Sequence, residues 1–185
     1  MIYFVSDIHL GAGSREQAQR TERAFCRWLD MVAAEATHLY LLGDIFDFWF
    51  EYRRVAPKGF VRVLGRLAEL TDRGVRVTLY TGNHDMWCYD YFERECGIEV
   101  VKSPRVECIA GKRLHLAHGD NMNIRGSLLL RLMNATFRSR VARWLFSWLV
   151  HPDLSLKFGH WWSGKSRKSH GAEPIAADRL DFLVD

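Results

Sequence analysis

Short apolar runs alternate with longer amphipathic segments along the first part of the chain. The runs rich in β-branched and aromatic residues, which we expect to form buried strands, are residues 2–5, 38–42 and 75–80. The segments with apolar side chains at helical spacing, which predict amphipathic helices, are residues 15–36 and 58–73. Gly74 is expected to end the second helix, because glycine tolerates the left-handed backbone that ends many helices. Strands that alternate with helices predict an α/β sheet with crossover connections.

The chain continues with a predicted hairpin and then changes character. Residues 106–109 and 113–117 are strand-like and flank an Ala-Gly turn. From Leu128 to Trp162, leucine, phenylalanine and tryptophan recur at helical spacing with arginines between them, and Pro152 interrupts the pattern. We therefore expect an apolar helical insert after the hairpin.

The composition is that of a globular domain. The chain has 185 residues, of which 48% are hydrophobic and 26% are charged, so it can bury a core without disulfides or metal ions. These values exclude a disordered polyelectrolyte, a collagen-like fibre and a cysteine-stapled mini-protein.

The net charge of +4 is unevenly distributed. Residues 121–170 hold nine Lys and Arg residues and a single acidic residue, Asp153, whereas the rest of the chain has more acidic than basic groups. A basic segment on a mildly acidic body is typical of contact with phosphates or with an anionic membrane surface. The alternative from charge alone is a solvated cationic face.

The cysteines and the N-terminus predict a cytoplasmic protein. The four cysteines form no CxxC pair and have no zinc-ligand spacing, which favours free thiols in a reducing compartment. The chain begins directly with a predicted core strand, without a basic region or cleavage site, so we expect no signal peptide. The longest uncharged stretch of the basic segment, residues 144–152, is far shorter than the ~20 residues that a membrane span needs.

Polar residues of the kind that bind metal ions follow each predicted strand. They are Asp7 and His9, then Asp44 and Asp47, then Asn83, His84 and Asp85, and finally His118 and Asp120. Because the carboxyl ends of strands in an α/β sheet share one edge, we expect four loops to bring five of them together. These five are Asp7, His9, Asp44, Asn83 and His118. Carboxylates, an amide oxygen and imidazoles are ligands for Mn, Fe, Zn and similar divalent ions.

The local spacing explains how each predicted ligand could reach a metal ion. We expect Asp7 and His9 to point the same way from extended backbone and so to reach one ion. Gly43 allows a sharp turn before Asp44, and Gly82 frees the backbone before Asn83. A carboxylate can bridge two cations, and two ions a few ångströms apart form a clamp for phosphoryl chemistry.

Taken together, these motifs resemble the calcineurin-like metallophosphoesterase superfamily over residues 1–120. They are Asp7-x-His9, Gly43-Asp44-x-x-Asp47, Gly82-Asn83-His84-Asp85 and His118-Gly119-Asp120. The resemblance implies a four-layer αββα sandwich and two divalent cations, with Mn²⁺ as the expected ion. It implies that Asp7 and His9 bind one ion, that Asn83 and His118 bind the other, and that Asp44 bridges them. By the same resemblance, His84 contacts the phosphoryl group and stabilises its developing charge.

One family motif does not occur in the chain. The superfamily pattern ends with Gly-His-x-His, and Gly159-His160 lacks the second histidine. We therefore expect that the C-terminal strands of the fold and these ligands are missing from this chain. The predicted organisation is a core at residues 1–122, the helical insert as a lid at 123–170, and the start of the C-terminal part of the core at 171–185. A non-catalytic binding module is the alternative that this departure favours.

A narrower resemblance is to UDP-2,3-diacylglucosamine pyrophosphohydrolases of lipid A biosynthesis. It rests on Asp7 to Leu10, on Leu41 to Trp49, and on the insert that ends with Gly159 to His170. It implies hydrolysis of the substrate pyrophosphate to UMP and 2,3-diacylglucosamine 1-phosphate. The residues expected to bind the substrate are Asn83, His84, Ser163, Lys165, Ser166, Arg167 and Lys168.

The insert suits a lipid-nucleotide substrate, because it combines apolar side chains for acyl chains with cations for a pyrophosphate. A basic apolar segment with tryptophans also predicts a peripheral position at the inner membrane. The alternative is a generic metallophosphoesterase or phosphodiesterase. We expect no nucleic-acid partner, because the basic segment lacks the stacking pattern of a nucleic-acid groove, and the sequence indicates no protein partner.

Overall fold

A parallel sheet organises the molecule. The computed structural model describes residues 1–52, 54–119, 139–152, 154 and 159. The sheet has the order β1-β2-β3-β4, and its strands are β1 (Ile2–Val5), β2 (His38–Leu42), β3 (Arg76–Tyr80) and β4 (Glu99–Val101). All three pairings are parallel. The predicted α/β class is therefore confirmed for the described residues.

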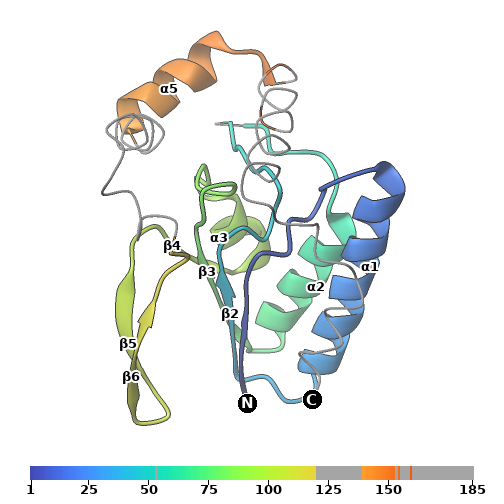
Figure 1. The fold of residues 1–185 in the computed structure, drawn as a ribbon, viewed down its shortest axis with the longest axis vertical. Coiled ribbons are helices and arrows are strands. Elements are labelled where there is room, and N and C mark those ends of the chain that lie inside the picture. Colours follow the sequence, from blue (N-terminus) through green and yellow to red (C-terminus); the bar gives the residue numbers. More distant parts are fainter. Residues whose placement is uncertain (53, 120–138, 153, 155–158, 160–185) are drawn as a thin grey trace.

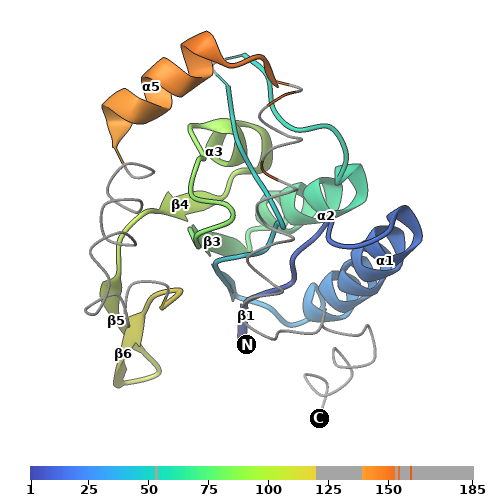
Figure 2. The same cartoon turned by 45° about the horizontal axis from the view of Figure 1, so that its top comes forward.

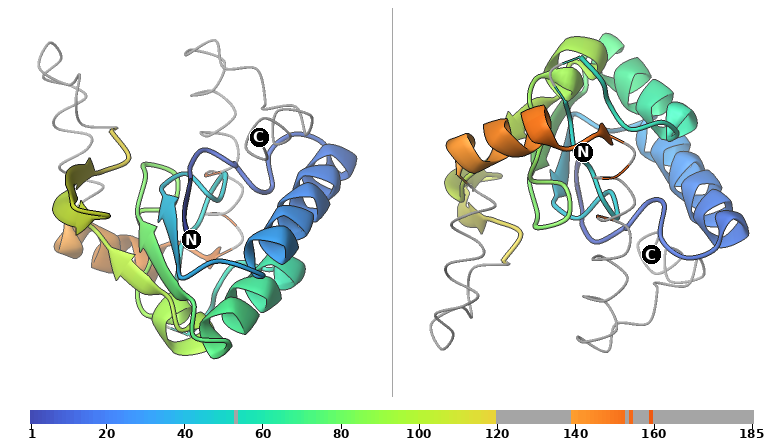
Figure 3. Two further views of the ribbon diagram at one scale, coloured as in Figure 1. Left: turned by 90° about the horizontal axis from the view of Figure 1, so that it is seen from below. Right: turned by 90° about the horizontal axis from the view of Figure 1, so that it is seen from above.

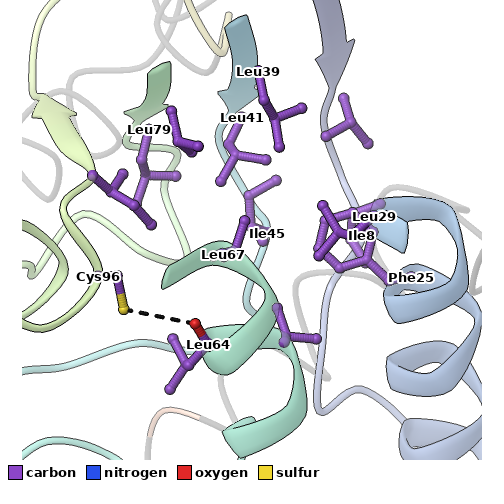
Figure 4. Close-up of a cluster of buried hydrophobic side chains, with 14 of the residues drawn as sticks. Ile8, Phe25, Leu29, Leu39, Leu41, Ile45, Leu64, Leu67, Leu79 and Cys96 are labelled. Carbon is purple, nitrogen blue, oxygen red and sulfur yellow. Dashed lines mark hydrogen bonds between the residues drawn. The ribbon is translucent and has the colours of Figure 1, made fainter. Parts of the chain in front are cut away.

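Helices cover one face of this sheet, as Figures 1 and 3 show. They are α1 (Arg15–Val32), α2 (Val61–Asp72) and the short α3 (Tyr91–Cys96). Figure 4 shows leucines of β2 and β3 packed against Leu64 and Leu67 of α2 and against Phe25 and Leu29 of α1. Full burial of each such side chain is worth about 1.5–3 kcal/mol, so this layer contributes most of the apolar stabilisation.

A hairpin covers the opposite face. Its strands β5 (Arg105–Ile109) and β6 (Lys112–Leu116) pair antiparallel in a separate sheet. Ala110 and Gly111 both have positive φ, as a two-residue type I′ turn requires. A smaller apolar cluster joins the hairpin to the sheet. The described residues thus form a helix layer, a sheet and a hairpin, and the complete four-layer sandwich stays a prediction.

One polar contact also fixes the hairpin to the sheet. The hydroxyls of Tyr40 and Tyr80 each donate a hydrogen bond to Glu107, at 2.6 Å. Burial alone would raise the pKa of Glu107, but these two bonds outweigh it and the pKa is lowered. Burial and the same contact raise the pKa of Tyr40 to about 12.

The elements differ from the sequence predictions at a few points. The first helix ends at Val32 instead of residue 36. The second begins only at Val61, because Gly59 and Phe60 both have positive φ. Helix α3 and strand β4 were not predicted. Helix α3 has six residues, and its first amides are bound by a side chain from a distant loop, Glu51, which no local pattern reveals.

The insert is helical where the structure describes it. Helix α5 (Arg140–Leu149) begins after Ser139, whose hydroxyl accepts a hydrogen bond from the amide of Ala142. It lies at the end of the molecule toward which the parallel strands run (Figures 1 and 2). Residues 123–138 and most of 150–170 lie outside the described residues, so the predicted domain bounds stay predictions. Within the described part of the chain, no helix combines the length and apolar character required to cross a bilayer.

Candidate metal centre

The predicted ligands lie at one edge of the sheet. Asp7 and His9 follow β1, Asp44 follows β2, Asn83 and His84 follow β3, and His118 follows β6. The structure brings carboxylate and imidazole atoms of five of these residues together, namely Asp7, His9, Asp44, His84 and His118. Asn83 is exposed at the same strand end, and its role as a ligand stays a prediction. Asp120 lies outside the described residues.

The loops after β1 and β2 run side by side and bind each other through their backbones. The amide of Asp7 donates to the carbonyl of Gly43 at 3.1 Å, and that of His9 donates to Asp44 at 3.0 Å. Asp7, His9 and Asp44 all have positive φ, between 49° and 56°. The prediction of extended backbone at Asp7 and His9 was therefore wrong. Non-glycine residues pay about 1 kcal/mol each for this conformation, which is a strain typical of functional sites.

Two glycines allow the strand-end loops to approach closely. A Cβ atom on Gly82 would lie 2.1 Å from Asp44 Oδ1, and one on Gly43 would lie 2.7 Å from the His118 ring. Gly43 also has a φ of 88°, which suits the expected turn before Asp44. Both positions therefore exclude any side chain, because Asp44 and His118, two of the predicted ligands, take the space.

Asp44 is the centre of the arrangement. Its Oδ2 lies 3.2 Å from His118 Nε2, 3.8 Å from His9 Nε2 and 3.9 Å from His84 Nε2. It belongs to two clusters whose ligand atoms lie within 4.8 Å of one another: one with His9 and His84, the other with Asp7 and His118. A carboxylate shared by two clusters has the position that a bridging ligand needs.

These clusters divide the residues differently from the pairing that the resemblance implies. In the structure Asp7 lies with His118, and His9 lies with His84, whereas the resemblance pairs Asp7 with His9. The shared position of Asp44 is common to both. Carboxylates and imidazoles this close together fit divalent cations such as Mn²⁺, Fe²⁺ or Zn²⁺, and the assignment of each ligand to one ion stays a prediction.

The rings of buried His84 and half-buried His118 are oriented by backbone carbonyls. Nδ1 of His118 donates to Leu42 at 3.0 Å, and Nδ1 of His84 donates to Asp47 at 2.7 Å. Because a carbonyl can only accept, Nδ1 carries a proton in both rings. In both rings Nε2 lies on the side of Asp44. Burial alone would lower the pKa of His118, but its contact with the Asp44 carboxylate raises this pKa to about 9. Burial lowers the pKa of His84, and the nearby His9 adds to this effect.

Asp44 itself is held in the charged form. Burial alone would raise its pKa, but the hydrogen bond and charge of His118 and the charge of His84 outweigh burial, so the pKa is lowered. The backbone amide of His84 also donates to Asp44 Oδ1 at 3.0 Å. The carboxylate therefore concentrates negative charge where two cations would meet.

Sequence reasoning gave no role to Asp85 and none to Asp47. Asp85 is fully buried and accepts the amides of Ile45 at 2.9 Å and Gly82 at 2.7 Å, so it ties the two glycine-bearing loops together. Burial and the charge of Asp44 raise its pKa to about 6. Asp47 Oδ1 lies 3.6 Å from His9 Nδ1. The only sequence signal for Asp47 and Asp85 was that each ends a motif, one beginning with Gly43-Asp44 and the other with Gly82-Asn83. Their contacts could not be predicted, because the partners come from distant loops.

The remaining predicted substrate residues are not tested. Ser163, Lys165, Ser166, Arg167 and Lys168 all lie outside the described residues. His84 lies in the centre, with Nε2 on the side of Asp44. In its neutral form this nitrogen can bind a metal ion, and when protonated it can donate to a phosphoryl oxygen, so the geometry is compatible with both roles.

Comparison with known proteins agrees with the resemblance seen in the sequence. A protein of Porphyromonas gingivalis named UDP-2,3-diacylglucosamine hydrolase is 40% identical over 168 residues, covering 91% of this chain and 64% of the relative. Relatives of the same name from Ralstonia nicotianae and Pseudomonas aeruginosa are 34% and 31% identical. They cover 77% and 100% of this chain, and 52% and 73% of their own lengths. The chain thus spans between half and two thirds of the first two relatives. The calcineurin-like phosphoesterase family matches residues 1–182, and the chain belongs to this family.

Proposed function

We propose that this protein hydrolyses the pyrophosphate of UDP-2,3-diacylglucosamine, giving UMP and 2,3-diacylglucosamine 1-phosphate, a reaction of lipid A biosynthesis. The observation that carries the proposal is the position of Asp44, whose carboxylate is shared by two clusters of ligand atoms at the sheet edge. Relatives at 31–40% identity that are named for this substrate support the choice of substrate.

In the proposed site, Asp44 would be shared by two divalent cations, and Mn²⁺ is our proposed ion. Asp7, His9, Asn83 and His118 are the further ligands. When bound, such cations supply the positive charge that activates water and stabilises phosphoryl oxygens. Asp85 keeps the loops of Asp44 and Asn83 at a fixed separation through its two backbone contacts.

His84 is proposed to stabilise the charge that develops on the phosphoryl group. Its backbone amide and its Nδ1 are already bound to Asp44 and to the Asp47 carbonyl, so the ring has a fixed direction. Nε2 is left to face the centre. This role requires the protonated ring, in which both nitrogens carry a proton and Nε2 donates. A fixed donor needs no reorganisation as the reaction proceeds, which is the basis of electrostatic catalysis.

The insert is proposed to bind the rest of the substrate. Acyl chains would pack on its apolar side chains, while Ser163, Lys165, Ser166, Arg167 and Lys168 would hold the nucleotide and pyrophosphate. On α5, Trp144 and Trp148 are 59% and 75% exposed. This exposure supports contact with lipid and a peripheral position at the cytoplasmic face of the inner membrane.

The proposal is tested by assaying the full-length gene product on three substrates: UDP-diacylglucosamine, a short-chain analogue and a small chromogenic phosphodiester. Each buried methylene is worth about 0.8 kcal/mol, so shortening the acyl chains should raise KM steeply. Charge reversal at Lys165 or Lys168 should weaken both UDP substrates and spare the small ester. Equal efficiency on all three would leave only a generic phosphoesterase.

The absence of Gly-His-x-His keeps a second class of function in view, a binding module without catalysis. Metal analysis of the purified chain separates the two. Two tightly bound ions per chain support the enzyme, whereas a chain that binds none supports either the module or a fragment that lacks some of the ligands.

A further inference from the structure

Residues 47–52 connect the metal centre with helix α5. We call them the connecting segment; they continue the loop of Asp44 and run alongside residues 84–87. The amide of Trp49 donates to the carbonyl of His84, and that of Glu51 donates to Trp87, both at 2.9 Å. Phe50 and Trp87 form a parallel bridge. The segment is thereby attached to the loop that carries His84.

Alternate side chains of the connecting segment face opposite ways. Trp49 and Glu51 point into the core, where Trp49 packs against Phe92 and donates its indole N–H to Glu51 at 2.8 Å. Glu51 also accepts the amides of Asp90 and Tyr91, at 3.1 and 3.3 Å. It is 2% exposed. A buried carboxylate with this many donors fixes the segment firmly, because each lost bond would leave a buried charge undersatisfied.

The other side chains face the insert. Phe50 and Trp87 both pack against Phe146 of α5, with ring centroids 5.3 and 5.4 Å apart. The hydroxyl of Tyr52 donates to the carbonyl of Val150 at 3.0 Å, which lies at the end of α5. A further contact lies beyond α5, where a Cβ on Gly159 would come within 2.3 Å of the Phe48 ring. Three alternate positions of the segment, 48, 50 and 52, thus touch the insert.

We propose that Phe50 and Tyr52 are positioning residues that set the specificity of the enzyme. They hold α5 at a fixed distance from the loop of Asp44, so that a long lipid substrate places its pyrophosphate at the metal centre. This inference rests on the proposed function. It adds that the loop that carries Asp44 also positions the insert. The side chains that do so are Phe48, Phe50 and Tyr52, which alternate along the segment with the inward-facing ones.

The aromatic side chains of α5 lie on two sides of the helix with different surroundings. Phe146 is half-buried in the aromatic junction, whereas Trp144 and Trp148, which stack with centroids 6.3 Å apart, are exposed. The helix therefore has one anchored side and one side available to an apolar ligand. A small phosphodiester that never reaches α5 needs no such anchor, so the junction should affect substrates according to their length.

The experiment compares four variants of the full-length protein: Phe50→Ala, Phe146→Ala, Tyr52→Phe and, as a matched control, Phe4→Ala. Phe146→Ala removes the same contact from the side of α5, in case Phe50→Ala does not fold. Phe4 stacks on Tyr40 at 5.0 Å on the hairpin face, away from the insert. Each variant is measured for hydrogen exchange of the α5 amides, for metal content, and for KM and kcat on long-chain and small substrates.

We expect faster exchange in α5 and about a tenfold rise in KM for the long-chain substrate in Phe50→Ala or Phe146→Ala, as for the loss of one or two aromatic contacts. Tyr52→Phe should give a change of about threefold. Metal content should be unchanged in these variants, and KM for the small ester should rise far less than KM for the long-chain substrate. Phe4→Ala should show no such difference between the two substrates.

Unchanged exchange in α5 for both alanine variants would overturn the anchoring. Equal losses on the long-chain and small substrates would overturn the specificity role. If the lipid nucleotide is no substrate at all, the proposed function fails, while the exchange data still decide whether Phe50 and Tyr52 anchor α5.

Discussion

The metal centre and helix α5 depart in opposite ways from the usual distribution of polar and apolar side chains. At the centre, Asp44, His84 and Asp85 are 4%, 9% and 0% exposed. On α5, Trp144 and Trp148 are 59% and 75% exposed. Burying charge and exposing large apolar groups both work against folding stability. The difference teaches what each region is suited to under the proposed function: the centre to divalent cations, and α5 to an apolar ligand or surface.

The largest effect is expected from Asp44→Ala. If Asp44 bridges two cations, the variant should lose at least one metal ion and nearly all turnover. The fold should be largely kept, because the apolar core does not include this residue. Metal analysis, turnover and circular dichroism of the full-length protein check this. Hydrolysis close to the wild-type rate would show that Asp44 is no bridge.

His84→Ala should cost about 10²–10³ in kcat, the usual loss for one donor to a developing oxyanion. Both ions should stay bound if His84 acts on the phosphoryl group. The ligand atoms of His84, His9 and Asp44 lie within 4.8 Å of one another, so the alternative is that the His84 ring binds a metal ion. A fall in metal content to one ion per chain would establish that alternative.

On α5, replacing both Trp144 and Trp148 by serine should leave the melting temperature unchanged, because both are exposed. Binding to anionic phospholipid vesicles should fall by about tenfold, since tryptophan anchors segments at membrane interfaces. The matched control is Val106→Ser on β5, an apolar residue that is 55% exposed. Vesicle co-sedimentation that falls equally in the control would mean that α5 has no special role.

The smallest effect concerns Glu107, a polar anchor outside both regions. Its pKa is lowered in the folded protein, so its contribution is present at neutral pH and is lost as the pH falls through its folded pKa. Glu107→Gln should therefore lower the free energy of unfolding by about 1 kcal/mol at pH 7. The gap to the wild type should close below about pH 4. Urea unfolding over a pH series measures this difference in the free energy of unfolding. A difference that does not change with pH would contradict the stabilising role of the Glu107 carboxylate.

The sequence predicted which side chains come together better than it predicted their local geometry. A strand that ends in Asp7, Asp44 or His84 places that residue at the carboxyl edge of the sheet, whatever its backbone angles. The left-handed φ of Asp7 and His9 could not be inferred, because tertiary backbone contacts with Gly43 and Asp44 impose it. The clustering of Asp7 with His118 likewise depends on how the hairpin meets the sheet.

The same limit applies to the residues that support the site. Asp85 and Glu51 act on backbone amides about 40 residues away in the chain, and no periodicity encodes such a contact. Helix α5 was predicted from its apolar spacing, but its attachment through Phe50 and Tyr52 was not. Patterns along the chain predict which elements form, whereas the contacts between loops follow only from the packed structure.

If the predicted ligands hold an ion, their spread along the chain links ion binding to folding. Asp7, Asp44 and His118 come together only when β1, β2 and the hairpin are all in place. In the unfolded chain these groups are far apart and would hold an ion weakly. A cation bound by them would act as a reversible cross-link that closes two long loops, adding about 4 kcal/mol at a thousand times its dissociation constant. Cellular supply of the metal would then govern not only turnover but also the lifetime of the folded protein against proteolysis.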